Sequence, residues 1–139
     1  MATPIYQADG FVSEESEFTI GSAAGRWRSL RGAPDIQIEV RSPGEAVASF
    51  DGWELLLLLD DSEFVPAEAQ AMARACPEYR HAAGVARCRR KLTIVSHDAD
   101  PEMDHFNDYL LAVETLAAGF HGVYVRDSAS GSWFDDGRA

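Results

Sequence analysis

The fold is decided by residues 36–59, which read IQIEVRSPGEAVASFDGWELLLLL. In the first part of this stretch, Ile36, Ile38 and Val40 alternate with polar residues. This period-two pattern is typical of a strand with one buried face. The last part, residues 53–59, is apolar nearly throughout, as expected of a central strand that is covered on both faces.

Turn signals separate the strands of this stretch. Pro43-Gly44 predicts a turn after the first strand, and Asp51-Gly52 is a strong signal for a two-residue hairpin. A weaker strand, residues 46–50, lies between the two turns. We therefore expect a meander of three strands, 36–41, 46–50 and 53–59.

Helices and strands alternate after residue 60. Pro66 suits the first turn of a helix, and small and apolar residues continue at helical spacing to Cys76. Residues 92–96 resemble a further strand. A clear helix follows, because Asp100 is a suitable N-cap and Pro101 suits the first helical position. This helix is expected to end at Gly119, with short strands to follow at 122–126 and 132–134.

The chain before residue 36 gives weaker signals. Residues 1–17 are polar and without periodicity, which predicts a flexible lead-in. Residues 18–32 are ambiguous; they contain glycines but lack the Gly-Lys-Ser/Thr ending of a phosphate loop. We expect residues 18–139 to form a single α+β domain, a size usual for one core.

The predicted order of elements is β-β-β-α-β-α-β-β. If strands 53–59, 92–96 and 122–126 share one sheet, the two helical crossovers make them parallel to each other. The meander and the last hairpin add antiparallel strands. The sequence thus predicts an α+β fold with a mixed sheet and helices mainly on one face.

The chain is strongly acidic, with 23 acidic and 12 basic residues and a net charge of −11. This charge argues against nucleic acid and anionic membranes as partners and favours a cationic protein. The longest apolar run, residues 55–59, is too short to span a bilayer. Two cysteines without CxxC spacing and an N-terminus without a signal-peptide pattern predict a cytoplasmic location.

The predicted topology gives the acidity a location. Ligands of open sheets with crossover helices bind beyond the carboxyl ends of the parallel strands. In this sequence those ends carry a set of carboxylates and one histidine, which we call the predicted acidic rim: Asp60, Asp61, Glu63, His97, Asp98, Asp100, Asp104 and Asp127. The alternative is that strand ends become loops and loops are polar.

The predicted rim does not carry a recognisable catalytic or metal signature. His97, Asp98, Asp100, Asp104 and His105 are possible ligand types, but their spacing matches neither the zinc helix motif nor the calcium loop. We therefore expect no metal, no cofactor and no enzymatic activity. A small ligand- or metal-binding domain, or an enzyme with a cleft near His97 and Asp98, is the alternative.

A basic patch at residues 74–91 is the other candidate binding face, since it contains six basic residues and only one acid. Ion pairing with the acidic remainder is the alternative explanation. Trp133, near Asp135 and Asp136, is a further candidate for an exposed partner contact. Strand 35–41, if at a sheet edge, could pair with a second copy, so we expect a monomer or weak dimer.

Residues 92–134 resemble the immunity proteins of bacterial polymorphic and contact-dependent toxin systems. The resemblance rests on the strand LTIVS at 92–96, the acidic loop after it, the helix around FNDYLL at 106–111 and GVYV at 122–125. It implies a small α+β protein that neutralises a cognate toxin by direct binding. The expected partner is a cationic toxin domain, recognised by charge complementarity.

Overall fold

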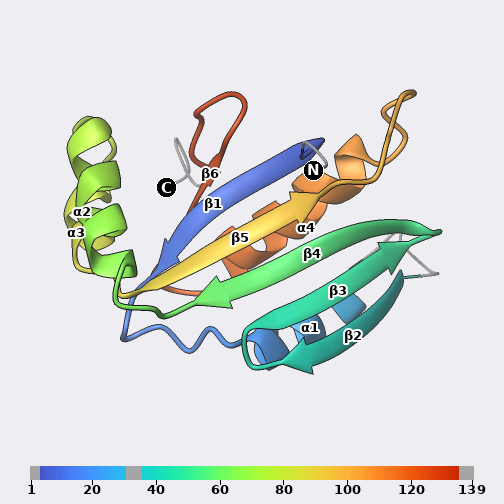
Figure 1. Cartoon of the computed structure of the whole chain (residues 1–139), viewed down its shortest axis with the longest axis horizontal. Helices are drawn as coiled ribbons and strands as arrows, with labels where there is room; N and C mark the ends of the chain where they lie inside the picture. The colour runs from blue at the N-terminus through green and yellow to red at the C-terminus, as the bar shows by residue number, and fades with distance from the viewer. Residues whose placement is uncertain (1–3, 31–35, 135–139) are drawn as a thin grey trace.

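The computed structural model of the protein describes residues 4–30 and 36–134. Six strands form one sheet in the order β2-β3-β4-β5-β1-β6, and all neighbouring strands are antiparallel (Figure 1). The α+β class is therefore confirmed, whereas the mixed sheet is not. The elements are β1 (Tyr6–Val12), α1 (Ile20–Arg28), β2 (Ile36–Ser42), β3 (Glu45–Phe50), β4 (Trp53–Asp60), α2 (Val65–Ala75), α3 (Ala82–Ala86), β5 (Arg90–Ser96), α4 (Phe106–Gly119) and β6 (Val123–Asp127).

The predicted meander is present as β2, β3 and β4. Asp51 and Gly52 have positive φ angles of 55° and 86°, as the two central residues of a tight hairpin turn require. The turn pairs Phe50 with Trp53 and so fixes the register between β3 and β4. The short range of these signals explains why this part of the fold follows directly from the sequence.

The leucine run of β4 is covered fully on one face only. Leu55 and Leu57 are completely buried, whereas Leu56 and Leu58 on the other face are partly exposed. The two faces of the sheet therefore differ. One carries the main core, and the other is covered over part of its area.

The predicted parallel pairing of strands 53–59 and 92–96 is wrong. β4 and β5 are antiparallel neighbours, with Leu56 opposite Val95 and Asp60 opposite Lys91. The helices α2 and α3 between them stay at one end of the sheet in place of crossing it (Figure 1). The chain consequently returns along the strand it has just left.

β1 is the largest departure from the predicted order. Residues 6–12 were expected in a flexible lead-in, but they form a strand between β5 and β6 that is antiparallel to both. β5 and β6 therefore run in the same direction, as their α4 crossover requires, without being neighbours. The predicted last hairpin is reduced to one isolated bridge between Arg126 and Trp133.

Helices cover the two faces of the sheet unequally. α1 and α4 lie behind the sheet in Figure 1 and pack on a core that all six strands help to form. In that core, the Trp27 indole on α1 donates a 3.0 Å hydrogen bond to the Ala112 carbonyl on α4. A smaller core on the opposite face joins Phe11 of β1 to α2 and α3. The prediction of helices mainly on one face holds for α1 and α4 only.

The segment around α1, left ambiguous by the sequence, is a helix with a capping box. The Thr19 hydroxyl accepts from the Ser22 backbone amide, and the Ser22 side chain accepts from the Thr19 amide. Such reciprocal bonds satisfy two donors that a helix start leaves free. Ser22 takes the place usually held by Glu or Gln, which weakens the sequence signal.

The predicted N-terminus of α4 is displaced. The helix begins at Phe106 with His105 as its N-cap residue, not at Pro101 after Asp100. Residues 101–105 form turns, and Met103 has a positive φ of 58°. The Asp100 carboxylate nevertheless accepts a backbone hydrogen bond from His105, at 3.0 Å.

Gly10 offers a test of the central position of β1. A Cβ atom at Gly10 would lie 2.6 Å from the Tyr124 backbone oxygen, closer than packing allows. We expect Gly10→Ala to lower the free energy of unfolding by about 1–3 kcal/mol, the usual cost of overpacking. Gly25→Ala is the control, because its Cβ on the exposed side of α1 meets nothing within 4 Å. That change should stabilise by about 0.5–1 kcal/mol in denaturant unfolding.

Candidate functional site

The structure divides the predicted acidic rim into two groups. β5 and β6 end at one end of the sheet, which brings His97, Asp98, Asp100, Asp104 and Asp127 to that end. β4 runs the other way, so Asp60, Asp61 and Glu63 lie near the start of β5. The seven-residue length of β5 separates the two groups by about 20 Å at the usual rise of a strand.

Other carboxylates join the first group. The β3–β4 turn and the start of β4 lie at the same end, and so does the first turn of α4 (Figure 1). We call this surface the acidic end: Asp51, Glu54, Asp98, Asp100, Glu102, Asp104, Asp108 and Asp127. The ion pairs of Arg41, Arg89 and Lys91 all involve carboxylates outside this group of eight.

Neutral donors hold the carboxylates of the loop after β5. The Asp98 carboxylate accepts from the Glu54 backbone amide at 2.7 Å, which ties the loop to β4. The Asp100 carboxylate accepts from the Tyr6 hydroxyl at 2.6 Å. A neutral donor orders a carboxylate without adding a positive charge, so these bonds fix the two groups in place without pairing them with a cation.

Asp127 is held in the same way at the end of β6. Its Oδ1 accepts from the Tyr109 hydroxyl at 2.7 Å, and its Oδ2 accepts from the Ser130 amide at 2.8 Å. The ring of Tyr109 stacks on that of Tyr6, with centroids 5.2 Å apart. Two stacked tyrosines, one on α4 and one on β1, thus each hold one carboxylate of the acidic end.

These contacts shift the pKa values of the groups involved. Burial acts to raise the pKa of Asp127, but the hydrogen bonds from Ser130 and Tyr109 outweigh it and leave the pKa below its usual value. The pKa of Asp100 is likewise lowered: burial opposes the shift, and the hydrogen bonds from Tyr6 and His105 prevail. Burial and the bond to Asp100 raise the pKa of Tyr6 to about 12. Both carboxylates are therefore charged at neutral pH.

His105 lies between an indole ring and a carboxylate. Its ring stacks on Trp53 with centroids 5.0 Å apart and planes 4° from parallel. Its Nδ1 lies 3.0 Å from the Asp108 Oδ2, an ion pair when the imidazole is protonated. The buried Trp53 Nε1 has no hydrogen-bond partner within the described chain. His105 thus packs as part of the structure, and His97 is exposed at the loop surface.

The opposite end of the sheet has mixed charge. Lys91 pairs with Glu68 at 2.8 Å and Arg89 with Glu14 at 3.1 Å. The Arg90 guanidinium donates to the carbonyls of Ser13, Ser16 and Phe18, which fastens the loop after β1. Part of the basic patch at 74–91 is therefore used in internal contacts, as the ion-pairing alternative expected.

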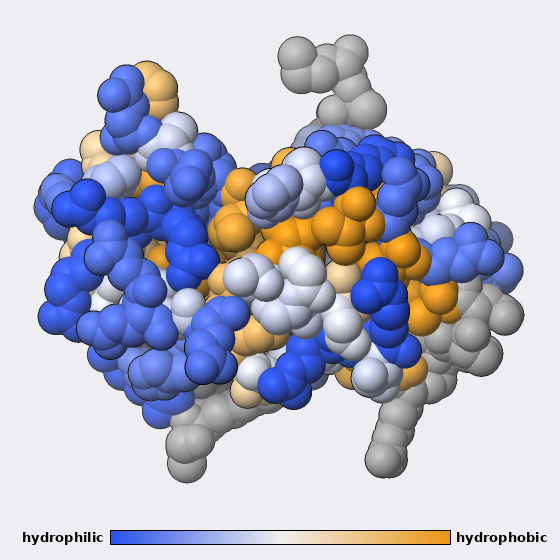
Figure 2. Space-filling model, turned by 90° about the horizontal axis from the view of Figure 1, so that it is seen from below, coloured by the Kyte–Doolittle hydropathy of each residue, from blue (hydrophilic) through white to orange (hydrophobic). Residues whose placement is uncertain are grey.

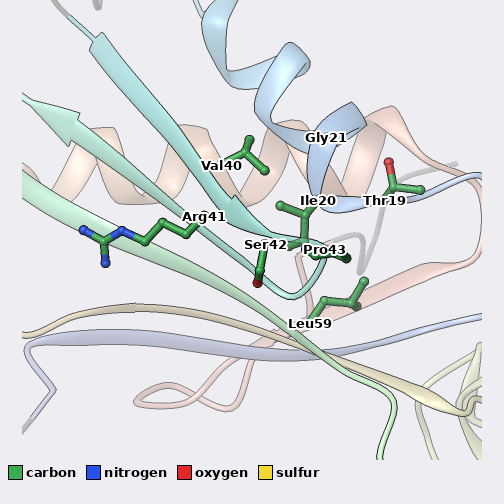
Figure 3. A pocket seen from close by; sticks show the side chains of 8 residues that line it. All are labelled: Thr19, Ile20, Gly21, Val40, Arg41, Ser42, Pro43 and Leu59. Carbon is green, nitrogen blue, oxygen red and sulfur yellow. The ribbon is translucent and has the colours of Figure 1, made fainter.

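Two cavities bear on the candidate site, and the larger of these two carries little chemistry. It has a volume of about 500 Å³ and lies between the start of α1, the β2–β3 turn and β4. Figure 3 shows Val40, Ile20 and Leu59 around it, with the Arg41 side chain directed away. Arg41 pairs with Glu39 and Glu45. Figure 2, a view from the β2 side, shows apolar surface gathered between hydrophilic flanks.

The smaller cavity adjoins the acidic end. Its volume is about 210 Å³, and it lies between α4 and the segment that follows β6. Asp127 contributes the charged group to its lining, and the remaining lining residues are Phe106, Leu110, Ser130, Ser132, Trp133 and Phe134. Neither cavity is lined by His97 or Asp98, the proposed centre of the alternative ligand site.

Trp133 is not the exposed anchor that the sequence suggested. It is 8% exposed, and its ring stacks on Tyr79 with centroids 3.9 Å apart and planes 5° from parallel. The stack joins the segment after β6 to the small core under α2 and α3. Trp133 therefore positions one wall of the smaller cavity.

Two further findings concern Cys88 and the possible metal ligands. Burial raises the pKa of the Cys88 thiol to about 11, so this thiol is protonated at neutral pH and a poor nucleophile. Within residues 4–30 and 36–134, no three His, Cys, Asp or Glu side chains are grouped so that they could hold a metal ion. None of the helices in that part of the chain is long and apolar enough to cross a membrane.

Comparison of the chain with protein-family models, curated proteins and solved structures found no match. The sequence prediction included Asp98, Asp100, Asp104 and Asp127, which the structure brings to one end of the sheet. It did not include Tyr6 and Tyr109, which hold Asp100 and Asp127. Tyr109 occupies a core position of the helical pattern, and Tyr6 lay in the supposed lead-in, so neither gave a local signal.

The Tyr109–Asp127 bond predicts a pH-dependent stability. Because the folded pKa of Asp127 is lowered, its contribution is complete above the ordinary aspartate pKa and is lost as the pH falls through the lowered value. We expect Tyr109→Phe to cost about 1.5–3 kcal/mol near neutral pH, the range for hydrogen bonds to charged groups. Below both pKa values the difference from the unsubstituted protein should shrink in denaturant unfolding.

A variant at Thr115 is the control for this prediction. The Thr115 hydroxyl, also on α4, donates to the Leu111 carbonyl at 2.7 Å, and that acceptor does not titrate. Thr115→Val should therefore change the free energy of unfolding by the same amount near neutral pH and below both pKa values of Asp127. An equal pH dependence for the two variants would contradict the assignment of the acid effect to Asp127.

Proposed function

We propose that this protein is a small binding protein whose acidic end docks a cationic protein partner. The finer proposal, which rests on the sequence resemblance, is that it is an immunity protein and that the partner is a cognate bacterial toxin domain. In this mode of action, the acidic end covers a basic active site or nucleic-acid-binding surface of the toxin. The protein itself performs no chemistry in this role.

One observation carries the proposal: eight carboxylates gather at one end of the sheet, and the ion pairs of Arg41, Arg89 and Lys91 all lie elsewhere. At least three of them are held by neutral backbone or hydroxyl donors. Their mutual repulsion raises the free energy of the isolated protein. A cationic partner relieves this repulsion, and charges fixed in advance lose little freedom on binding.

Charge neutralisation at the two ends of the sheet tests this proposal. A partner is first recovered with tagged protein from the native host and then purified. We expect Asp51→Asn, Glu102→Gln and Asp104→Asn together to slow its association by about ten-fold at low salt, since steering raises on-rates by 10–10³. Stopped-flow or surface-based kinetics at several salt concentrations provide the measurement.

The matched control removes the same number of charges at the far end. Asp60→Asn, Asp61→Asn and Glu63→Gln change the net charge equally but lie about 20 Å away, beyond the Debye length at physiological salt. Their combined effect on association should be less than about two-fold. The proposal fails if no cationic protein is recovered, or if both triple variants slow association equally.

A further inference from the structure

The smaller cavity gives the acidic end a specific contact as well as a charge. We propose that this cavity, between α4 and the segment after β6, receives one arginine side chain of the cationic partner. This inference rests on the proposed function and names the residue type that the site recognises. Its parts are a small volume, aromatic walls and one fixed carboxylate, and each part restricts the occupant.

The volume restricts the occupant to a single side chain. Pockets for drug-sized molecules and cofactors usually enclose about 300–1,000 Å³. The cavity encloses about 210 Å³, which is below that range. It therefore suits one inserted group of a larger partner better than a separate small molecule.

The walls favour a flat and weakly hydrated group. Three of the lining residues are aromatic, Phe106, Trp133 and Phe134, and Leu110 is aliphatic. A guanidinium stacks on aromatic faces and is more weakly hydrated than an ammonium, so it loses less on leaving water. Arginine is consequently favoured over lysine among the cationic side chains.

The charge in the lining excludes neutral and anionic groups. Asp127 Oδ1 accepts a hydrogen bond from the Tyr109 hydroxyl and Oδ2 accepts one from the Ser130 amide, and the Ser130 hydroxyl and the Ala129 amide also stabilise the charged form. All of these donors are neutral, so the carboxylate keeps a negative charge with which a guanidinium in the cavity can pair. A neutral occupant would desolvate this charge without pairing it, which is costly.

The position of the cavity couples it to the rest of the acidic end. Phe106 directly follows His105, whose backbone amide donates to the Asp100 carboxylate. The surrounding carboxylates therefore attract a basic partner toward the same place where one arginine can insert. The carboxylates around the cavity thus attract the partner from a distance, and the cavity itself recognises the arginine at contact.

Two small probes of nearly equal shape test the site. Nα-acetyl-arginine amide and its citrulline analogue are titrated against the whole protein and followed by amide NMR. We expect the arginine probe to shift resonances of residues 106–110 and 127–134, and the uncharged citrulline probe to bind at least about ten-fold more weakly. Equal binding of the two probes, or no shift with either, would overturn the proposal.

Variants locate the binding site of the probe. Asp127→Asn should weaken the arginine probe by about ten-fold, whereas Asp104→Asn removes an equal charge outside the cavity and should change it by less than about two-fold. Ser132→Phe places a ring at the cavity and keeps Asp127 charged, so it should block the probe. Circular dichroism and thermal unfolding check that each variant is folded; unchanged probe binding in folded Asp127→Asn and Ser132→Phe would contradict the site.

Kinetics with the recovered partner distinguish a failure of this inference from a failure of the proposed function. Ser132→Phe should accelerate dissociation of the complex by about ten-fold, as expected for a central contact, with little change in association. If neutralising the acidic end slows association while Ser132→Phe leaves the complex unchanged, the cavity inference fails and the proposed function stands. If the arginine probe binds but no cationic protein does, the proposed function fails.

Discussion

Strand β1 pairs with β5 on one side and with β6 on the other, and the rest of the structure depends on this double pairing. It joins the meander and the α4 crossover into a single sheet of six strands. It also sets the directions of β5 and β6, so that both finish at the same end. The pairing leaves little room at Gly10, where β1 approaches the Tyr124 backbone of β6. β1 thus connects the strand that leads to Asp98 and Asp100 with the strand that ends at Asp127.

The same strand brings Tyr6 to the carboxylate loop. Tyr6 begins β1 and lies opposite Ser96, the last residue of β5, so that its hydroxyl reaches Asp100 just beyond. The stacked Tyr109 repeats this arrangement for Asp127 on the next strand. Packing and charge are therefore linked at this end, because the aromatic core supplies the hydroxyl groups that order the carboxylates.

The sequence predicted the parts of the fold that short-range signals determine. Alternation in 36–41 and the Asp51-Gly52 turn specify the meander within a few residues of each strand. β1 carries a mixed sequence, and its partners lie as far away as Asp127, so its place follows from long-range pairing that no local pattern encodes. The rim prediction failed for Asp60, Asp61 and Glu63 for a related reason. Helices α2 and α3 looked like a crossover in sequence, yet they return the chain beside β4.

The partners that hold several of the carboxylates differ between the two ends of the molecule. At the end that carries α2 and α3, Lys91 and Arg89 pair with Glu68 and Glu14, while Asp60 accepts hydrogen bonds from Ser62. At the acidic end, hydroxyl and amide donors order the carboxylates and leave their charge in place. An internal cation would have given the folded chain comparable order and would have removed its attraction for a basic surface. Neutral donors therefore order these carboxylates in the folded protein without supplying a compensating positive charge.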